Sequence, residues 1–186
     1  MDEWYYKGVA FQRQQRYEDA VKAYDRALLL KPQSPKGWYN KGNSLAKLKK
    51  SEEAIIAYDK AISFYPQFLL AYLKKGNIFL GLKKYNDAIR AYDLALKIHP
   101  HFFDALYYKG RALEGLNRNS DAQEYYDKVL EIDSYHARAS SRIGLILIKQ
   151  RHYIQGIKIL FQSITKGFYL CLFSIIGLKY GKKTLV

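Results

Sequence analysis

The sequence repeats itself every 34 residues, and this period constrains the fold more than any other feature. Glycine recurs at that interval at Gly8, Gly42, Gly76, Gly110 and Gly144. Alanine keeps the same step at Ala20, Ala54, Ala88 and Ala122, tyrosine at Tyr24, Tyr58, Tyr92 and Tyr126, and proline at Pro32, Pro66 and Pro100. A fixed period of this length is typical of one supersecondary unit stacked on copies of itself. The sequence therefore predicts a repeat architecture.

The sequence pattern predicts two helices in each repeat. In the second repeat, Lys36–Leu48 carries large apolar residues at helical spacing, and Glu52–Phe64 places alanines and Tyr58 on one face. A polar break at residues 49–51 separates the two halves, and Pro66 ends the second because proline cannot continue a helix. Small residues on both helices allow their backbones to approach closely. The pattern predicts an all-α fold of helix pairs.

These columns resemble the tetratricopeptide repeat, whose motif has an aromatic residue at repeat position 4, glycine at 8, a large apolar residue at 11, alanine at 20 and 27, an aromatic residue at 24 and proline at 32. The first repeat fits throughout, with Trp4, Gly8, Phe11, Ala20, Tyr24, Ala27 and Pro32. The resemblance implies antiparallel helix pairs in an α-solenoid with a right-handed superhelix, whose first helices line the concave face. We expect repeats at 1–34, 35–68, 69–102 and 103–136, and a degenerate repeat at 137–170.

The residues after the fifth repeat do not fit the motif. The run Phe168–Leu178 is apolar and too short to span a bilayer, which takes about 20 residues. We expect residues 171–186 to form an apolar and basic capping segment with an extra C-terminal helix. Its exposed apolar surface has three explanations: self-association, residence in a larger complex or an altered reading frame at the gene's end, and a membrane-surface anchor using Lys179, Lys182 and Lys183.

Lysine replaces the leucine usual in the family at repeat position 7, in Lys7, Lys41, Lys75 and Lys109. One interpretation is that each aliphatic stem packs between helices while the ammonium group reaches water. The other is a basic stripe at the edge of the groove.

The charge is strongly positive and uneven. The chain has 31 Lys and Arg against 17 Asp and Glu, and residues 137–186 hold nine basic residues and no acidic one. This balance suits nucleic acid, an anionic membrane or an acidic protein, or it serves only solubility. A single cysteine argues against a disulfide framework and weakly favours a reducing compartment, the cytoplasm. The N-terminal stretch lacks an apolar segment, so we expect no secretory signal.

The resemblance implies that repeat positions 2, 5, 6, 9, 12 and 13 face the groove. Positions 5, 6 and 9 are aromatic, amide-bearing and basic, and none of these residues is a carboxylate. Tyrosine gives rigid contact area, asparagine offers a donor and an acceptor, and Lys and Arg favour carboxylates. The predicted peptide-binding residues, which also include Arg138 at position 2 of the fifth repeat, are Tyr5, Tyr39, Asn40, Asn43, Lys74, Asn77, Tyr108, Arg111, Arg138 and Arg142.

No motif supports catalysis. His99 and His101 lack a third metal ligand, and Cys171 has no neighbouring base. We therefore predict a non-enzymatic scaffold or adaptor, without metal or cofactor, that binds an extended and acidic peptide of a partner protein. The alternative is an RNA-binding repeat protein that uses its basic and aromatic surface, where bases stack on tyrosine rings.

Overall fold

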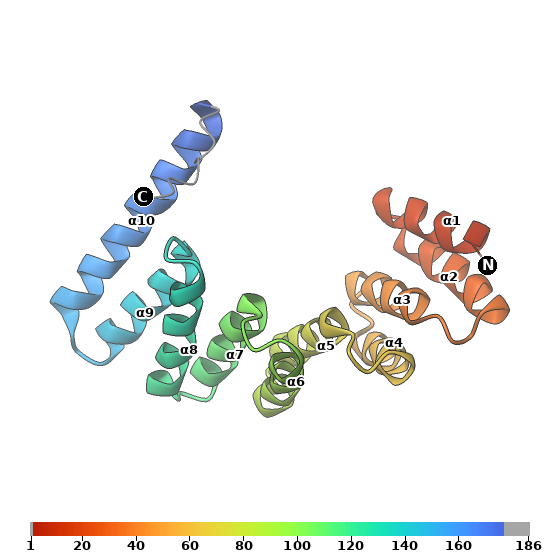
Figure 1. The fold of residues 1–186 in the computed structure, drawn as a ribbon, viewed down its shortest axis with the longest axis horizontal. Coiled ribbons are helices and arrows are strands. Elements are labelled where there is room, and N and C mark those ends of the chain that lie inside the picture. The colour runs from red at the N-terminus through yellow and green to blue at the C-terminus, as the bar shows by residue number, and fades with distance from the viewer. Residues whose placement is uncertain (1, 177–186) are drawn as a thin grey trace, which may run out of the picture. The chain divides into compact units, whose positions relative to one another are not determined.

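The computed structural model describes residues 2–176, with side chains from residue 3 to residue 164. The described residues form ten helices and no strand, and successive helices run side by side in pairs (Figure 1). The helices are α1 Asp2–Arg13, α2 Tyr17–Leu30, α3 Pro35–Lys47, α4 Ser51–Phe64, α5 Leu69–Gly81, α6 Tyr85–Ile98, α7 Phe103–Gly115, α8 Asn119–Ile132, α9 Ala137–Lys149 and α10 Tyr153–Ile176. The predicted all-α class is confirmed.

The chain forms two compact units, an N-terminal unit, Met1–Leu116, and a C-terminal unit, Asn117–Val186. Their boundary lies between α7 and α8, inside the predicted fourth repeat.

The turn between the two helices of a pair has the same geometry in every repeat. Lys49, between α3 and α4, takes a left-handed conformation with φ 60°, and the amide of Lys50 donates to the Leu45 carbonyl at 3.0 Å. This arrangement satisfies carbonyls at the end of α3. The equivalent residues with positive φ are Gln15, Lys83, Asn117 and Arg151. Between α2 and α3, the side chain of Ser34 caps α3 by accepting from the Gly37 amide at 3.2 Å.

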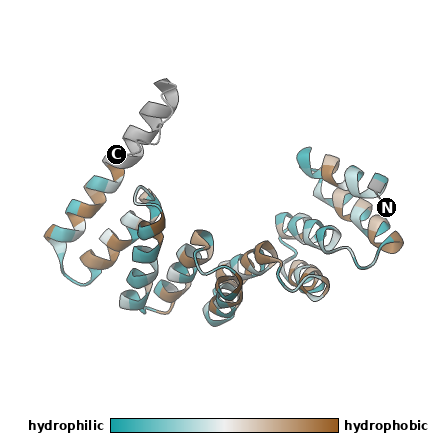
Figure 2. Ribbon diagram, viewed as in Figure 1, coloured by the Kyte–Doolittle hydropathy of each residue, from teal (hydrophilic) through white to brown (hydrophobic). Residues whose placement is uncertain are grey.

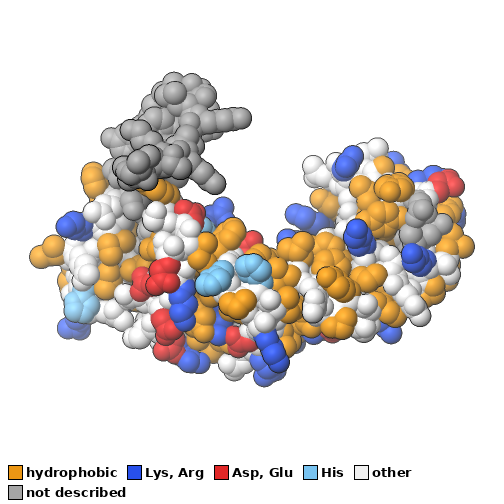
Figure 3. All heavy atoms as spheres, in the orientation of Figure 1, with side chains coloured by type: hydrophobic (Ala, Val, Ile, Leu, Met, Phe, Trp, Pro, Cys, Tyr) orange, Lys and Arg blue, Asp and Glu red, His pale blue; other side chains and the backbone are white. Residues whose placement is uncertain are grey.

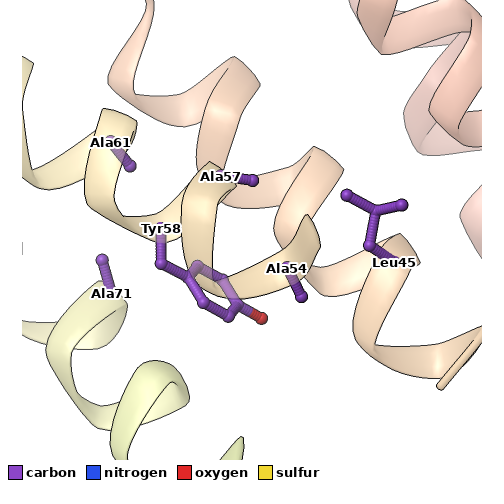
Figure 4. Packing of buried hydrophobic residues seen from close by; sticks show 6 residues of the cluster. All are labelled: Leu45, Ala54, Ala57, Tyr58, Ala61 and Ala71. Atoms are coloured by element: carbon purple, nitrogen blue, oxygen red, sulfur yellow. The ribbon is translucent and has the colours of Figure 1, made fainter. Parts of the chain in front are cut away.

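Glycine and tyrosine set the distance between paired helices in the N-terminal unit. A Cβ atom on Gly42 of α3 would lie 2.7 Å from the Tyr58 ring of α4, a separation that real contacts do not show. Tyr58 is buried with alanines of α4 and α5 and with Leu45 of α3 (Figure 4). The first and third repeats repeat this contact, between Gly8 and Tyr24 and between Gly76 and Tyr92. In the core, tyrosine rings therefore fill the space that the small residues leave between paired helices.

Three of the four lysines at repeat position 7 join consecutive repeats of the N-terminal unit by ion pairs. Their Nζ atoms lie 2.5 Å from the aspartate at position 25 of the preceding repeat, in the pairs Lys41–Asp25, Lys75–Asp59 and Lys109–Asp93, whereas Lys7 pairs with Glu3 inside α1 at 2.7 Å. The Lys41 Nζ also lies 5.2 Å from the centre of the Trp38 ring. These lysines therefore form a Lys–Asp ladder between repeats, which neither sequence interpretation included. Their charges are balanced locally rather than offered as a basic stripe.

The C-terminal unit ends in one long helix, where the sequence led us to expect two. Helix α10 runs without a break from Tyr153 to Ile176, so it passes residue 170 and includes residues 171–176 of the predicted capping segment, whose residues 177–186 lie outside the described part of the chain. Phe168 stands at repeat position 32, where proline follows α2, α4 and α6, and the apolar sequence allows the helix to continue. The remaining domain boundaries stay predictions. The side chains of Phe168–Leu178, to which we assigned an apolar contact surface, lie outside those described. No described helix is long and apolar enough to cross a membrane.

Candidate peptide-binding groove

A groove of about 610 Å³ lies in the N-terminal unit along α1, α3 and α5. These are the first helices of the first three repeats, and Tyr17 of α2 and Tyr58 of α4 also line the groove. The lining residues are Gln12, Tyr17, Tyr39, Asn43, Ala46, Lys47, Tyr58, Lys74, Asn77 and Ile78. The groove thus brings together four predicted site residues: Tyr39, Asn43, Lys74 and Asn77.

The two asparagines are held by tyrosine hydroxyls from the second helices. The Tyr58 hydroxyl donates to Asn43 Oδ1 at 2.9 Å, and the Tyr92 hydroxyl donates to Asn77 Oδ1 at 2.8 Å. Burial raises the pKa of both tyrosines above the usual range, so the hydroxyls stay protonated and remain donors. Because each Oδ1 atom accepts a hydrogen bond from a tyrosine hydroxyl, the orientation of each side-chain amide is fixed. The NH₂ group is then the part of the amide that can donate to another acceptor.

Asn77 has the more available amide of the two. Asn43 also hydrogen-bonds with Tyr39, whose pKa is raised by burial and lowered in part by that bond. Repeat position 5 holds Leu73 in the third repeat, which cannot make the same bond. The Asn77 amide nitrogen consequently has no acceptor among the described residues and remains a donor for a ligand.

The charge in the groove is positive. Lys47 and Lys74 line it, no carboxylate does, and neither lysine makes an ion pair with the described residues. Lys74 precedes Asn77 by three residues on α5 and therefore shares its face. An ammonium group and an amide donor on one face can hold a carboxylate together.

Tyr5 and Asn40 take part in a different arrangement from the one we expected. Asn40 Nδ2 donates to the Tyr5 hydroxyl at 2.9 Å, and Gln12 Nε2 donates to the Asn40 carbonyl at 3.0 Å and to Ser44 Oγ at 2.8 Å. The Tyr24 hydroxyl in turn donates to Gln12 Oε1 at 2.7 Å. The network links the first repeat to α3, so these polar groups are used for packing between repeats.

The other predicted residues lie away from the groove lining. The Tyr108 ring stacks on Tyr92, with centroids 6.2 Å apart, and the positive charge of Arg111 partly opposes the raised pKa of Tyr92, which burial dominates. Arg138 and Arg142 belong to α9 in the C-terminal unit and are not placed relative to the groove.

Sequence reasoning missed six lining residues, namely Gln12, Tyr17, Ala46, Lys47, Tyr58 and Ile78. Gln12 and Lys47 occupy repeat positions 12 and 13, which the family pattern assigns to the concave face, so extending the comparison to those positions would have found them. Tyr58 is part of the core motif, and no sequence signal shows that this buried side chain also lines the groove. No group of three or more residues able to hold a metal ion occurs within the described part of the chain.

The fold and groove define a class of protein: an α-solenoid of helix pairs with a polar groove on its first helices. The Tetratricopeptide repeat family matches residues 5–67 and 73–153, well over half of the chain. The chain belongs to the tetratricopeptide repeat family, and the predicted resemblance is confirmed. No curated protein matches the sequence significantly.

Solved structures agree with this fold. The structure of MamA is 20% identical with a TM-score of 0.82, covering 88% of this chain and 96% of that chain. A MamA from Desulfovibrio magneticus RS-1 is 18% identical with a TM-score of 0.84, covering 90% of this chain and 95% of that chain. YrrB, described as a tetratricopeptide repeat protein with an unusual peptide-binding site, is 19% identical with a TM-score of 0.73, covering 88% and 84%. At these identities the likeness concerns the fold alone.

Proposed function

We propose that this protein is a non-enzymatic scaffold that binds an extended, acidic peptide segment of a partner protein in the groove along α1, α3 and α5. Family membership supports the coarser part, a scaffold for protein–protein interaction. The peptide-binding site described for YrrB is consistent with it. The acidic specificity is our own inference from the lining of the groove.

The observation that carries the proposal is the pairing of fixed amide donors with unpaired lysines. Tyr92 holds Asn77 with its NH₂ group available, and Lys74 stands one helical turn away. An extended peptide presents backbone carbonyls and side-chain carboxylates, and both are acceptors. The tyrosine rings of the lining supply apolar contact area with little loss of rotamer freedom. The groove therefore suits a segment that is rich in Asp or Glu.

Fluorescence anisotropy with a labelled peptide of alternating Glu and Leu tests the assignment. Replacing Asn77 and Lys74 together by Ala should weaken binding by about tenfold or more, because hydrogen bonds to charged groups contribute about 1.5–3 kcal/mol. The matched control replaces Asn86 and Lys97 of α6, which are exposed outside the groove, by Ala and should leave the affinity unchanged. Equal loss in both double variants, or equal binding of a peptide with Gln in place of Glu, would contradict the proposal.

RNA binding is the second candidate, and the excess of basic residues favours it. The Lys–Asp ladder weakens the argument, since three of the regularly spaced lysines are paired, and the face of the N-terminal unit in Figure 3 shows basic side chains dispersed among hydrophobic ones. Titration with a single-stranded RNA at increasing salt separates the candidates. If the protein binds RNA, its affinity should fall steeply as the salt concentration rises. Absence of RNA binding at low salt would exclude RNA binding as the function.

We also infer a cytoplasmic location, which rests on the single cysteine of the chain. Fractionation of cells that express a tagged form of the full chain tests it, and recovery in an extracytoplasmic or membrane fraction would contradict it.

A further inference from the structure

Helix α10 presents an apolar face to solvent in the C-terminal unit. Ile154, Ile157, Phe161 and Ile164 follow one another at helical spacing, so they lie on one side of the helix. Ile154 is 88% exposed, Ile157 60% and Ile164 68%. Figure 2 shows hydrophobic segments recurring along this part of α10. Isoleucine side chains rarely gather at a protein surface unless a partner covers them, because removing apolar surface from water is favourable.

The same face is covered in the N-terminal unit. Ile157, Phe161 and Ile164 stand at repeat positions 21, 25 and 28, which Val21, Asp25 and Leu28 occupy on α2. Val21 packs against the core of the second repeat, Asp25 pairs with Lys41 of α3, and Leu28 lies against Gly37 of α3. Positions 21, 25 and 28 therefore form the surface that receives the first helix of the following repeat.

The two surfaces differ in exposure and in chemistry. Leu28 is 6% exposed beneath α3, whereas Ile164 at the same repeat position is 68% exposed. Phe161 replaces the aspartate that pairs with lysine in the earlier repeats. Helix α10 thus keeps the docking surface of a repeat but exchanges its polar contact for an apolar one. A helix that docks here needs an apolar residue opposite Phe161, where α3 has Lys41.

The C-terminal sequence that contains this face is strongly basic. Residues 137–186 hold nine basic residues and no acidic one, and Lys158 is exposed on α10 next to the stripe. Two copies of this surface would bring like charges together, which disfavours a second copy of the chain. Acidic residues beside an apolar stripe would complement it.

We propose that the exposed face of α10 docks an amphipathic helix of another protein, with an apolar stripe flanked by Asp and Glu, in the place that α3 takes on α2. This surface is separate from the peptide groove of the N-terminal unit, so the two proposals can fail independently.

A synthetic amphipathic helix tests the proposal. The probe is a labelled peptide of about 18 residues, or five helical turns, with leucine on one face and glutamate on the other. A second peptide carries lysine in place of glutamate. The full chain should bind the glutamate peptide and not the lysine peptide. Replacing Ile157 and Ile164 by Ala should weaken binding by about tenfold or more, since both side chains lose buried apolar surface.

The matched control replaces Leu29 of α2 and Ile56 of α4, which are similarly exposed, by Ala and should leave the affinity unchanged. Circular dichroism verifies that both double variants keep their helix content. Equal binding of the two peptides, or an equal loss in both double variants, would overturn the proposal. Light scattering could also overturn the proposal. If the chain forms a dimer and the Ile157 and Ile164 double variant abolishes it, the occupant of this face is a second copy of the chain. Binding that requires removal of residues 177–186 would identify that segment as the occupant and overturn it as well.

Discussion

The repeats of the N-terminal unit and the last helix pair of the C-terminal unit follow one plan with different side chains. In the second repeat, Gly42 accommodates the ring of Tyr58. In the last pair, Leu160 replaces that tyrosine, and a Cβ atom on Gly144 would lie 2.8 Å from Leu160 Cγ and 3.0 Å from the Gly156 carbonyl oxygen. Two facing glycines bring the helix backbones together where no large ring separates them. The glycine at repeat position 8 therefore faces a tyrosine ring in one unit, and a leucine and a backbone carbonyl in the other.

The contact surfaces between repeats also differ between the two units, because polar pairs in one are replaced by apolar residues in the other. Lysine and aspartate alternate between the repeats of the N-terminal unit, whereas Ile143 and Phe161 occupy repeat positions 7 and 25 in the fifth repeat. Polar pairs fix the register of one helix on the next because only one alignment satisfies both charges. An apolar face has no such requirement and tolerates different partners. The comparison suggests that the N-terminal unit is built for a defined stack and α10 for an external helix.

The largest effect is expected from Gly42→Ala in the glycine–tyrosine contact. The added methyl group overlaps the buried Tyr58 ring, so the free energy of unfolding should fall by about 2–3 kcal/mol. Urea denaturation measures it. Gly81→Ala is the control, because a Cβ atom at Gly81 meets nothing within 4 Å, and it should leave stability unchanged or raise it by about 0.5 kcal/mol. Similar losses in both variants would mean that tyrosine does not set the helix spacing.

Removing the Tyr92 hydroxyl tests the polar part of the same contact. Tyr92→Phe deletes the donor to Asn77 Oδ1, and the free energy of unfolding should fall by about 1 kcal/mol, the net contribution of one hydrogen bond. The same variant should lower the affinity for the acidic peptide, because the Asn77 side-chain amide can then rotate. Tyr72→Phe is the control, since the Tyr72 hydroxyl makes no hydrogen bond with the described residues. Unchanged peptide affinity in Tyr92→Phe would mean that the Tyr92 hydroxyl does not contribute to peptide binding.

The sequence was sufficient for the helix pairs and for the small residues that let paired helices approach closely, because both follow from a strict period. It was also sufficient to nominate Asn43 and Asn77, whose repeat position faces the groove. It did not distinguish Asn40, which packs between repeats, from Asn77, which keeps a donor available. That difference depends on which neighbour supplies a hydroxyl across a helix interface. Nor could the period predict α10, because a helix continues wherever no residue stops it.

Ion pairs in the ladder should contribute less than the buried contacts. Lys75 and Asp59 are both partly exposed, so a double-mutant cycle with Lys75→Met and Asp59→Asn should give a coupling energy of about 0.5 kcal/mol. High salt should reduce the coupling. A coupling energy near zero at low salt would leave the ladder without a role in holding the repeats in register.

The smallest effect is expected at Asp127, where the ladder is interrupted. Asp127 stands at position 25 of the fourth repeat, and Ile143 replaces the lysine of the next repeat. Partial burial raises the pKa of Asp127, and the negative charge of Glu131 raises it further. An acid with a raised folded-state pKa costs stability when it is ionised, so the cost is present at neutral pH and disappears as the pH falls below the usual value of 3.8.

Asp127→Asn should therefore stabilise the protein slightly at pH 7, by about 0.3 kcal/mol, the size of a like-charge pair four residues apart on a helix. Solvent exposure of Asp127 keeps the effect small. Thermal unfolding at pH 7 and below pH 3.8 measures the difference, which should vanish at the lower pH. Adding Glu131→Gln should give little further gain, because the first change has already removed the repulsion. A loss of stability in Asp127→Asn at pH 7 would mean that this carboxylate has a favourable partner, and that the contrast between the two units does not extend to this position.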